Sequence, residues 1–285
     1  MKLNHRAQQY RRVRFTKLIV NMWKNFFRND LSGLAAQVGF WSLYSLFPFV
    51  IFLVAISSLL PIVTSHDTAL QTLKRFVPPS VFDIITPTVK SLLIQPSGLI
   101  AAGTLLLALW AASRAVSSLI ISLNRVYEVQ ETRPFWKTKV IALSLTVTVV
   151  IIYMLAFILL VIGPIVSDFI LHHLGLSHTV HLTYRLIRLG VVSLAMILAF
   201  SLIYGFAPNN QRDRKPILPG AIFAMAGWFA TSAGFSFYIK NLANLNRFYG
   251  TLGAVVALLT WLYLIGLMIL LGGVLNSEIK QQMDG

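Results

Sequence analysis

The sequence predicts an all-α, polytopic membrane protein with six transmembrane helices. Hydrophobic residues make up 56% of the 285 positions and charged residues only 12%, and the mean hydropathy is +0.74. The apolar residues gather in six long runs that polar segments separate. A helix needs about 20 apolar residues to cross a hydrocarbon layer of about 30 Å. Each run reaches that length, and the predicted spans cover residues 33–60, 97–122, 140–166, 186–206, 217–239 and 252–275.

The basic residues are distributed unevenly between the two sides of these spans. The net charge is +15, and 16 of the 24 Lys and Arg residues lie in segments on the side of the termini, against seven on the other side. Because Lys and Arg are retained in the cytoplasm, both termini are expected there, in a bacterial inner membrane. Topology thus explains the basic excess, and no nucleic-acid partner is expected. The chain has no cysteine, which excludes disulfides and thiolate metal sites.

Residues 1–30 are predicted to form a basic amphipathic helix on the cytoplasmic membrane surface. Its apolar residues recur every three or four positions, at Val13, Leu18, Ile19, Met22, Trp23, Phe26 and Phe27. Basic residues occupy the other faces, so membrane lipids are the expected partner and a docked soluble protein is the alternative. Since this segment lacks a signal-peptide core, the first span is expected to be an uncleaved anchor. Asp30 or Ser32 would cap its helix.

The transmembrane domain is predicted over residues 31–279, with a short cytoplasmic tail at 280–285. The longest connection, Pro61 to Pro96, contains five prolines and apolar stretches between them. It is expected to form two short helices on the outer surface, with a lid over the bundle as the alternative. The second outer connection carries four histidines, at 172, 173, 178 and 181. Gly175 interrupts their helical spacing and no cysteine is near, so neither a metal nor a cofactor is expected.

The sequence predicts a kink in the first span and close helix packing at the fifth. Pro48 in the first span frees the carbonyl of Tyr44 and should kink that helix, which makes it a candidate gate. In the fifth span, Gly220, Ala224 and further small residues recur every four positions, so that another backbone can approach closely. The partner helix belongs either to the same chain or to a second copy, and a homo-oligomer is one expectation.

Arg114 is the one charged residue well inside a predicted span. It is expected about 8 Å from the cytoplasmic edge of the hydrocarbon layer. A charge at such a depth is costly unless it is paired or hydrated, which points to a functional site. The alternative is that the long side chain extends to the interface and has no further role.

Polar residues at a similar depth predict a cytoplasm-facing vestibule around Arg114. The same helical face carries Ser117, Ser118 and Arg125, with Asn124 beside them. The first span contributes Gln37, Trp41 and Tyr44, and Glu278 follows the sixth span on the same side of the membrane. In this vestibule Arg114 would bind an anion. Hydrogen bonds between helices are the alternative role for these side chains.

The positions of the acidic residues disfavour ion-coupled transport, provided that Asp30 and Glu278 lie at the interface. None of the nine Asp and Glu residues lies within a predicted span, whereas ion-coupled carriers commonly hold a carboxylate near mid-membrane. Ion-coupled transport is therefore disfavoured. No nucleophile–base pair, carboxylate pair or phosphate-binding glycine loop follows from residue spacing either, so an enzyme is not expected.

Four motifs resemble the YihY/BrkB family of bacterial inner-membrane proteins. They are AAQVGFWSLYSLFPF from Ala35, SLNRVYEVQETRPFWK from Ser122, PNNQRDRKPILPGAIFA from Pro208 and FYGTLGAVVALLTWLYL from Phe248. The resemblance runs from about Asp30 to Glu278 and implies six transmembrane helices with both termini cytoplasmic. Such proteins were formerly named ribonuclease BN or a virulence factor. No cytoplasmic carboxylate or histidine cluster in this sequence supports a ribonuclease.

The resemblance also implies a set of motif positions at the two membrane faces. On this sequence they are Gln37, Tyr44, Pro48, Asn124, Tyr127, Arg133, Pro134, Trp136, Pro208, Pro219, Gly220, Tyr249, Gly250, Gly253 and Trp261. Gly250 and Gly253 would allow a tight turn or close packing at the outer entry to the last span. A purely structural role at helix ends and turns explains most of these positions as well as a functional role does.

These observations predict a transporter of an amphipathic or anionic solute, with lipid as the first candidate. Some relatives are proposed to move lipids or lipid-linked glycans, which agrees with this prediction. The alternative is a non-transporting scaffold or envelope-assembly factor that recruits a partner through its basic helix. A lipid-modifying enzyme is the third hypothesis.

Overall fold

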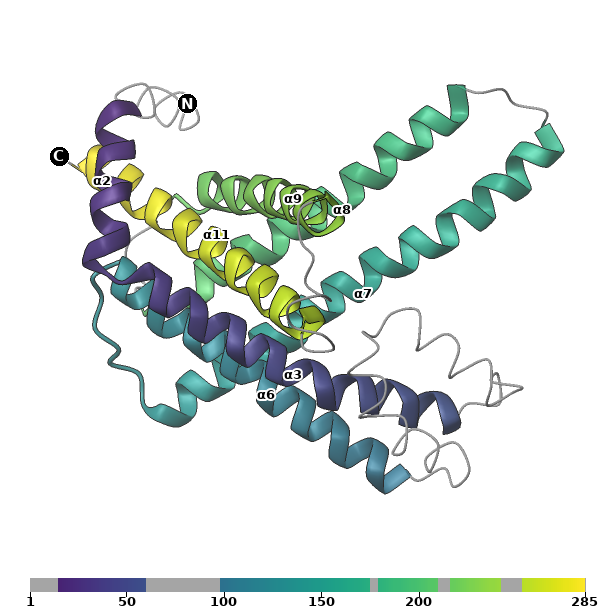
Figure 1. Ribbon diagram of the computed structural model, residues 1–285, viewed down its shortest axis with the longest axis horizontal. Coiled ribbons are helices and arrows are strands. Elements are labelled where there is room, and N and C mark those ends of the chain that lie inside the picture. Colours follow the sequence, from purple (N-terminus) through teal and green to yellow (C-terminus); the bar gives the residue numbers. More distant parts are fainter. Residues whose placement is uncertain (1–14, 60–97, 175–178, 210–215, 242–252, 285) are drawn as a thin grey trace, which may run out of the picture. The chain divides into compact units, whose positions relative to one another are not determined.

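The computed structural model describes residues 15–59, 98–174, 179–209, 216–241 and 253–284. Across these ranges the fold is all-α, with seven helices and no strand, as predicted (Figure 1). The helices are α2 (Phe15–Arg28), α3 (Leu31–Leu59), α6 (Gly98–Val126), α7 (Phe135–Leu174), α8 (Thr179–Phe206), α9 (Leu218–Asn241) and α11 (Gly253–Asp284).

Five of the described helices are long and apolar enough to cross a membrane. The qualifying segments are Gly98–Val126, Phe135–Leu155, Leu189–Phe206, Leu218–Tyr238 and Val255–Met283. Helix α3 has 29 residues and no charged side chain, but its described part is not one of the five. The count of six spans, the inner-membrane location and the side of the termini therefore stay predictions.

Several helices extend beyond the apolar runs that predicted them. Helix α6 continues past residue 122 to Val126, and α7 runs from Phe135 to Leu174 rather than from 140 to 166. Backbone hydrogen bonds continue a helix whether its side chains are apolar or polar, so an apolar run marks only the lipid-crossing part. As a result, the backbone of His172, His173 and His181 is helical rather than part of a connecting loop.

Other predicted features fall outside the described residues. These are the two short helices between Pro61 and Pro96, the first half of the 1–30 helix, Gly250, and the side chains of the four histidines. Among the side chains that are described, no group of three or more His, Asp or Glu could hold a metal.

Asp30 separates α2 from α3 and caps the second of them. Its φ of 48° lies in the left-handed region, which short polar side chains tolerate better than most. The side-chain Oδ1 accepts a hydrogen bond from the backbone N–H of Gly33 at 3.2 Å. This confirms Asp30 as the residue that caps the α3 helix.

The chain divides into two compact units, and each unit combines segments that are far apart in the sequence. Unit 1 contains residues 1–29, 120–227 and 268–285, and unit 2 contains residues 30–119 and 228–267. Helices α6, α9 and α11 each contribute one part to each unit.

Unit 1 contains α7 and α8, which lie side by side (Figure 1). It also contains the last part of α6, the first part of α9 and the last part of α11. Its core side chains include Ile120, Leu123, Met196, Phe200, Ile203, Leu270 and Val274. Helices α9 and α11 approach each other closely at Gly220 and Gly272, because a Cβ atom at Gly220 would overlap the carbonyl oxygen of Gly272. Glycine at both positions is what permits this backbone contact.

Unit 2 packs α3 against the first part of α11. A Cβ atom at Gly39 would lie 3.0 Å from the backbone nitrogen of Tyr263, and one at Gly266 would lie 3.3 Å from the carbonyl oxygen of Ala35. The hydroxyl groups of Ser32 and Tyr263 are hydrogen-bonded at 2.9 Å. Trp261 on α11 also donates its indole N–H to Ser232 on α9 at 3.2 Å.

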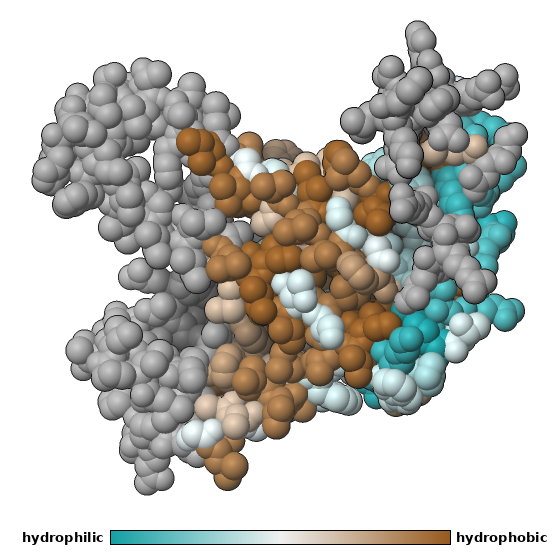
Figure 2. All heavy atoms as spheres, turned by 180° about the vertical axis from the view of Figure 1, so that it is seen from behind, coloured by the Kyte–Doolittle hydropathy of each residue, from teal (hydrophilic) through white to brown (hydrophobic). Residues whose placement is uncertain are grey.

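Large apolar side chains cover much of the described surface. Figure 2 shows hydrophobic residues dominating the face drawn there, with hydrophilic side chains gathered on one side of it. Leu99, Leu106 and Leu194 are 85%, 68% and 69% exposed, respectively. A soluble protein rarely exposes such continuous apolar area, whereas a lipid-embedded one requires it.

Candidate functional site

In unit 2, Arg114 contacts two tryptophan rings. The guanidinium carbon lies 5.5 Å from the ring centroid of Trp41 on α3 and 5.2 Å from that of Trp110 on α6. Trp110 precedes Arg114 by four residues, so both side chains lie on one face of α6. The two rings are perpendicular, with centroids 6.2 Å apart. We call Arg114, Trp41 and Trp110 the tryptophan–arginine cluster.

This cluster stabilises the arginine without neutralising it. The electron-rich ring faces attract the cation, and the attraction grows in a desolvated setting. The Nε atom of Arg114 is buried and has no hydrogen-bond partner among the described residues. Neither of the two ion pairs in the described part of the chain involves Arg114. Among the described residues, the Arg114 guanidinium thus has two aromatic contacts and no carboxylate partner.

The other predicted vestibule residues of unit 2 lie on the same two helices. Tyr44 is 46% exposed and packs edge-on against Trp41 at 5.9 Å between ring centroids. Gln37 is exposed on the turn before Trp41. Ser117 donates its hydroxyl to the backbone carbonyl of Ser113 at 2.8 Å, and Ser118 is buried. The structure thus brings Trp41 to Arg114 and Tyr44 to Trp41.

The predicted vestibule residues of unit 1 have different surroundings. Arg125 is exposed, Asn124 is 5% exposed and Glu278 is 3% exposed. Asn124 and Glu278 each belong to a separate network of hydrogen bonds within this unit.

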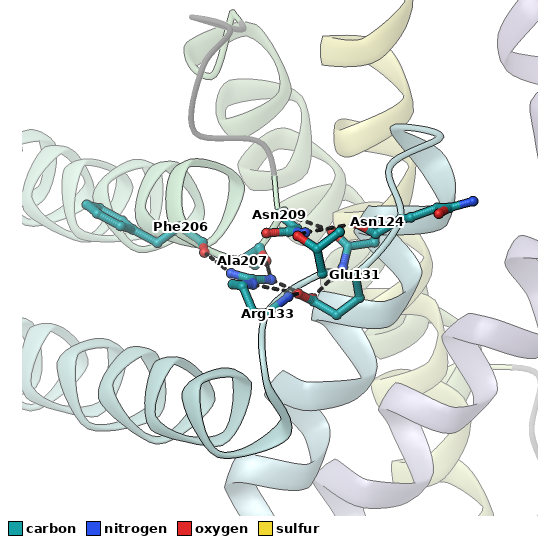
Figure 3. Close-up of polar contacts among 8 residues, drawn as sticks. Asn124, Glu131, Arg133, Phe206, Ala207 and Asn209 are labelled. Atoms are coloured by element: carbon teal, nitrogen blue, oxygen red, sulfur yellow. Dashed lines mark hydrogen bonds and ion pairs between the residues drawn. The ribbon is translucent and has the colours of Figure 1, made fainter.

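Asn124 belongs to a group of four residues that we call the polar latch, together with Glu131, Arg133 and Asn209 (Figure 3). Its amide nitrogen donates to Glu131 Oε2 at 2.8 Å, and its carbonyl oxygen accepts from the backbone N–H of Asn209 at 2.8 Å. The side chain of Asn209 in turn donates to the Gln130 carbonyl and the Thr132 hydroxyl, both at 2.8 Å. The latch joins the α6–α7 connection to the end of α8.

Arg133 connects the carboxylate of Glu131 to the backbone at the end of α8. It donates from Nε and Nη2 to the two carboxylate oxygens of Glu131, at 2.7 and 2.6 Å, and from Nη2 to the Ala207 carbonyl at 2.8 Å (Figure 3). A basic side chain is well placed at the carbonyl end of a helix, where backbone oxygens lack intrahelical partners. The hydrogen bonds from Arg133 lower the pKa of Glu131 below its ordinary value.

Glu278 fixes α2 to the end of α11. Its carboxylate accepts hydrogen bonds from the side-chain amides of Asn21 at 2.9 Å and Asn25 at 3.0 Å. Asn29 donates a hydrogen bond from its side-chain amide to the side-chain oxygen of Asn25. We call Asn21, Asn25 and Asn29 the asparagine stripe. The asparagine stripe was not predicted from the sequence, although the four-residue spacing of its members indicates one face of a helix.

A further buried network lies where α9 begins. Asn276 is fully buried; it accepts a hydrogen bond from the Gly220 backbone N–H at 2.7 Å and donates to the Ile217 carbonyl at 3.2 Å. Tyr127 is hydrogen-bonded to the same asparagine. Asn276 therefore supplies an acceptor for the Gly220 N–H, which a helix start leaves unpaired, and a second donor for the Ile217 carbonyl, which also accepts from the Ala221 N–H.

Comparison with known proteins identifies the family. The family model described as "Virulence factor BrkB" matches residues 22–285. The chain belongs to the BrkB family. It is 33% identical to the "Putative ribonuclease-like protein YfkH" of Bacillus subtilis, over 87% of this chain and 90% of that protein. No solved structure matches the chain.

More distant relatives of this BrkB-family chain are named as membrane proteins. A UPF0761 membrane protein of Alteromonas mediterranea is 27% identical over 88% of this chain and 83% of its own length. One from Pseudoalteromonas atlantica is 24% identical over 93% and 86%. Together with the apolar helices, these matches establish a membrane protein.

Proposed function

We propose that this BrkB-family protein binds an anionic, amphipathic solute, lipid first among the candidates, and moves it across the membrane. The observation that carries the proposal is Arg114, a cation on a membrane-length apolar helix with tryptophan rings but no carboxylate as its described partners. A guanidinium in such a setting gains strongly from an anion, because two parallel hydrogen bonds to a phosphate or carboxylate strengthen at low dielectric.

The neighbouring rings suit the apolar part of the same solute. Trp41, Tyr44 and Trp110 provide large apolar faces beside the charge, and ligand sites commonly combine such faces with a few polar groups. Among the five candidate spans, the only acidic residue is Glu278, near the end of α11. Coupling to protons or sodium through a mid-membrane carboxylate is therefore not part of the proposal.

The test compares ligand binding and flux for four proteins: the unchanged chain, Arg114→Ala, Arg114→Lys and Lys137→Ala. Native mass spectrometry after incubation with phosphatidylglycerol and phosphatidylcholine reports binding, and vesicles with a fluorescent phosphatidylglycerol report movement between leaflets. Lys137→Ala removes an exposed cation from α7 and is the matched control. We expect Arg114→Ala to reduce both signals at least tenfold and Arg114→Lys to retain part of each.

Equal binding and flux in the unchanged chain and Arg114→Ala, with unaltered melting temperatures, would contradict the proposal. Arg114 would then be a side chain that reaches the interface without a ligand. Binding without flux in the unchanged protein would restrict the proposal to a lipid-binding scaffold.

A further inference from the structure

Helix α2 turns its polar side toward the protein and its apolar side outward. Asn25 and Asn29 are 3% and 8% exposed, and Asn21 is half-buried. By contrast, four apolar residues are more than half exposed, at Ile19, Val20, Trp23 and Phe27. We call these four the outer stripe. Ile19, Trp23 and Phe27 are four residues apart, as are the three asparagines, so each set forms a continuous line along the helix.

The buried side of α2 determines this orientation. Glu278 accepts hydrogen bonds from two members of the asparagine stripe, and Leu18 is buried beside them at 4% exposure. Turning the helix about its axis would leave the buried carboxylate without these donors, which is costly. The outer stripe is therefore exposed because the opposite side is held by specific polar contacts.

Basic side chains flank the outer stripe. Lys17, Lys24 and Arg28 are all exposed and follow one another along the helix next to Val20 and Phe27. Arg28 pairs with Glu128 of the α6–α7 connection. The first 29 residues contain eight Lys and Arg and no acidic residue, so the segment carries a strongly positive potential.

The length of α11 places α2 near a membrane surface. This helix has 32 residues, about 48 Å, whereas about 20 residues cross the hydrocarbon layer. The apolar segment runs from Val255 to Met283, which is longer than one crossing requires, so a crossing that begins at Val255 ends near residue 275. Glu278 lies just beyond that point and holds α2 there. The α6–α7 connection bonded to Arg28 leads into Phe135 and Trp136, which are 77% and 66% exposed, as interfacial aromatic residues are.

We propose that the outer stripe of α2 inserts into the headgroup layer of an anionic membrane, with Lys17 and Lys24 against lipid phosphates and Glu278 setting the orientation of the helix. Aromatic and aliphatic side chains beside lysines are the combination that binds helices to such surfaces. A second copy of this chain fits less well, because its own basic flank would face the first one. The proposal is independent of solute binding at Arg114.

The absence of cysteine from the sequence makes a direct test possible. A single nitroxide label is placed at Val20→Cys in the otherwise unchanged full chain, and the matched control is Gln281→Cys, an exposed position near the end of α11. Both proteins are reconstituted in vesicles of phosphatidylcholine alone or with 30% phosphatidylglycerol. Accessibility to oxygen, which partitions into lipid, is compared with accessibility to a water-soluble nickel chelate.

We expect the Val20 label to favour oxygen over nickel several-fold more than the Gln281 label, with the difference largest in phosphatidylglycerol. Lys17→Gln with Lys24→Gln should remove the dependence on phosphatidylglycerol. Glu278→Ala should make the Val20 label more mobile, because α2 loses its fixed orientation.

Two outcomes would overturn the proposal. A Val20 label that is as accessible to nickel as the Gln281 label in both kinds of vesicle would show that water or a soluble protein, not lipid, covers the stripe. Dipolar broadening between Val20 labels, lost on dilution with unlabelled protein, would show that a second copy covers it. Melting temperatures of the labelled proteins within a few degrees of the unchanged chain show that the label has not unfolded α2.

Discussion

Asn25 on α2 donates its side-chain amide to Glu278 on α11 at 3.0 Å, across 253 positions of sequence. Both residues are almost completely buried. The pair joins the two ends of the described chain, and it explains why α2 presents Trp23 and Phe27 outward. A buried carboxyl group with two amide donors is a stronger constraint on orientation than an apolar contact, because any other orientation leaves it without hydrogen-bond partners.

We expect Glu278→Ala to destabilise the protein by about 1–3 kcal/mol, because Asn21 and Asn25 then lose their buried acceptor. Glu278→Gln keeps one acceptor oxygen and should cost less. Thermal unfolding in detergent measures both variants, with Gln281→Ala, an exposed neighbour, as the control. Equal melting temperatures for Glu278→Ala and the unchanged chain would show that the contact contributes nothing.

Arg133→Ala should destabilise the polar latch, since Glu131 and the Ala207 carbonyl both lose a donor. Hydrogen bonds to charged groups contribute about 1.5–3 kcal/mol each, so a fall in melting temperature of several degrees is expected. Arg125→Ala removes an exposed arginine from the end of α6 and should have little effect on unfolding. A comparable loss in both variants would argue against a specific role for Arg133.

The latch should also make stability depend on pH. The folded-state pKa of Glu131 lies below its ordinary value of 4.5, so the folded state binds this proton less readily than the unfolded state does. The stabilisation is therefore complete above the ordinary pKa and is lost as the pH falls through the lowered one. We expect melting temperatures to fall less steeply between pH 6 and 3 in Glu131→Gln than in the unchanged chain. Identical slopes would contradict this prediction.

Gly220→Ala tests the close backbone approach of α9 and α11 in unit 1. The added methyl group would overlap the Gly272 carbonyl and the Asn276 side chain, and backbone cannot easily move aside. We expect a loss of about 1–3 kcal/mol. Gly234→Ala, on the same helix α9, is a matched control because nothing lies within 4 Å of the new atom. That change should be neutral or stabilising by about 0.5–1 kcal/mol, since alanine favours a helix.

The tryptophan–arginine cluster predicts an ordered series at position 41. Trp41→Phe keeps an aromatic face toward Arg114, whereas Trp41→Leu keeps only apolar volume. If the cluster binds the proposed anionic lipid, binding should fall less in the Phe variant than in the Leu variant. Native mass spectrometry with phosphatidylglycerol measures the series. Equal binding in both variants would mean that the aromatic face does not position Arg114.

The amino-acid sequence by itself determined the all-α class, the membrane character and the family. Those properties follow from local information: runs of apolar residues, charge counts and short motifs, each readable without knowing which helices touch. Asp30 as a helix cap belongs to the same category, because its partner Gly33 is three residues away. The sequence also singled out Arg114, since a charge within a long apolar run stands out locally.

Only the tertiary structure decided which polar residues meet. Sequence analysis grouped Glu278 and Asn124 with Arg114 by estimated depth, yet Glu278 contacts the asparagine stripe and Asn124 belongs to the polar latch. It also assigned Leu18 and Trp23 to one apolar face, whereas the structure buries the first and exposes the second. Helical periodicity places residues around an axis, but the side that faces the protein depends on partners hundreds of residues away. Those partners come together only when the chain has folded.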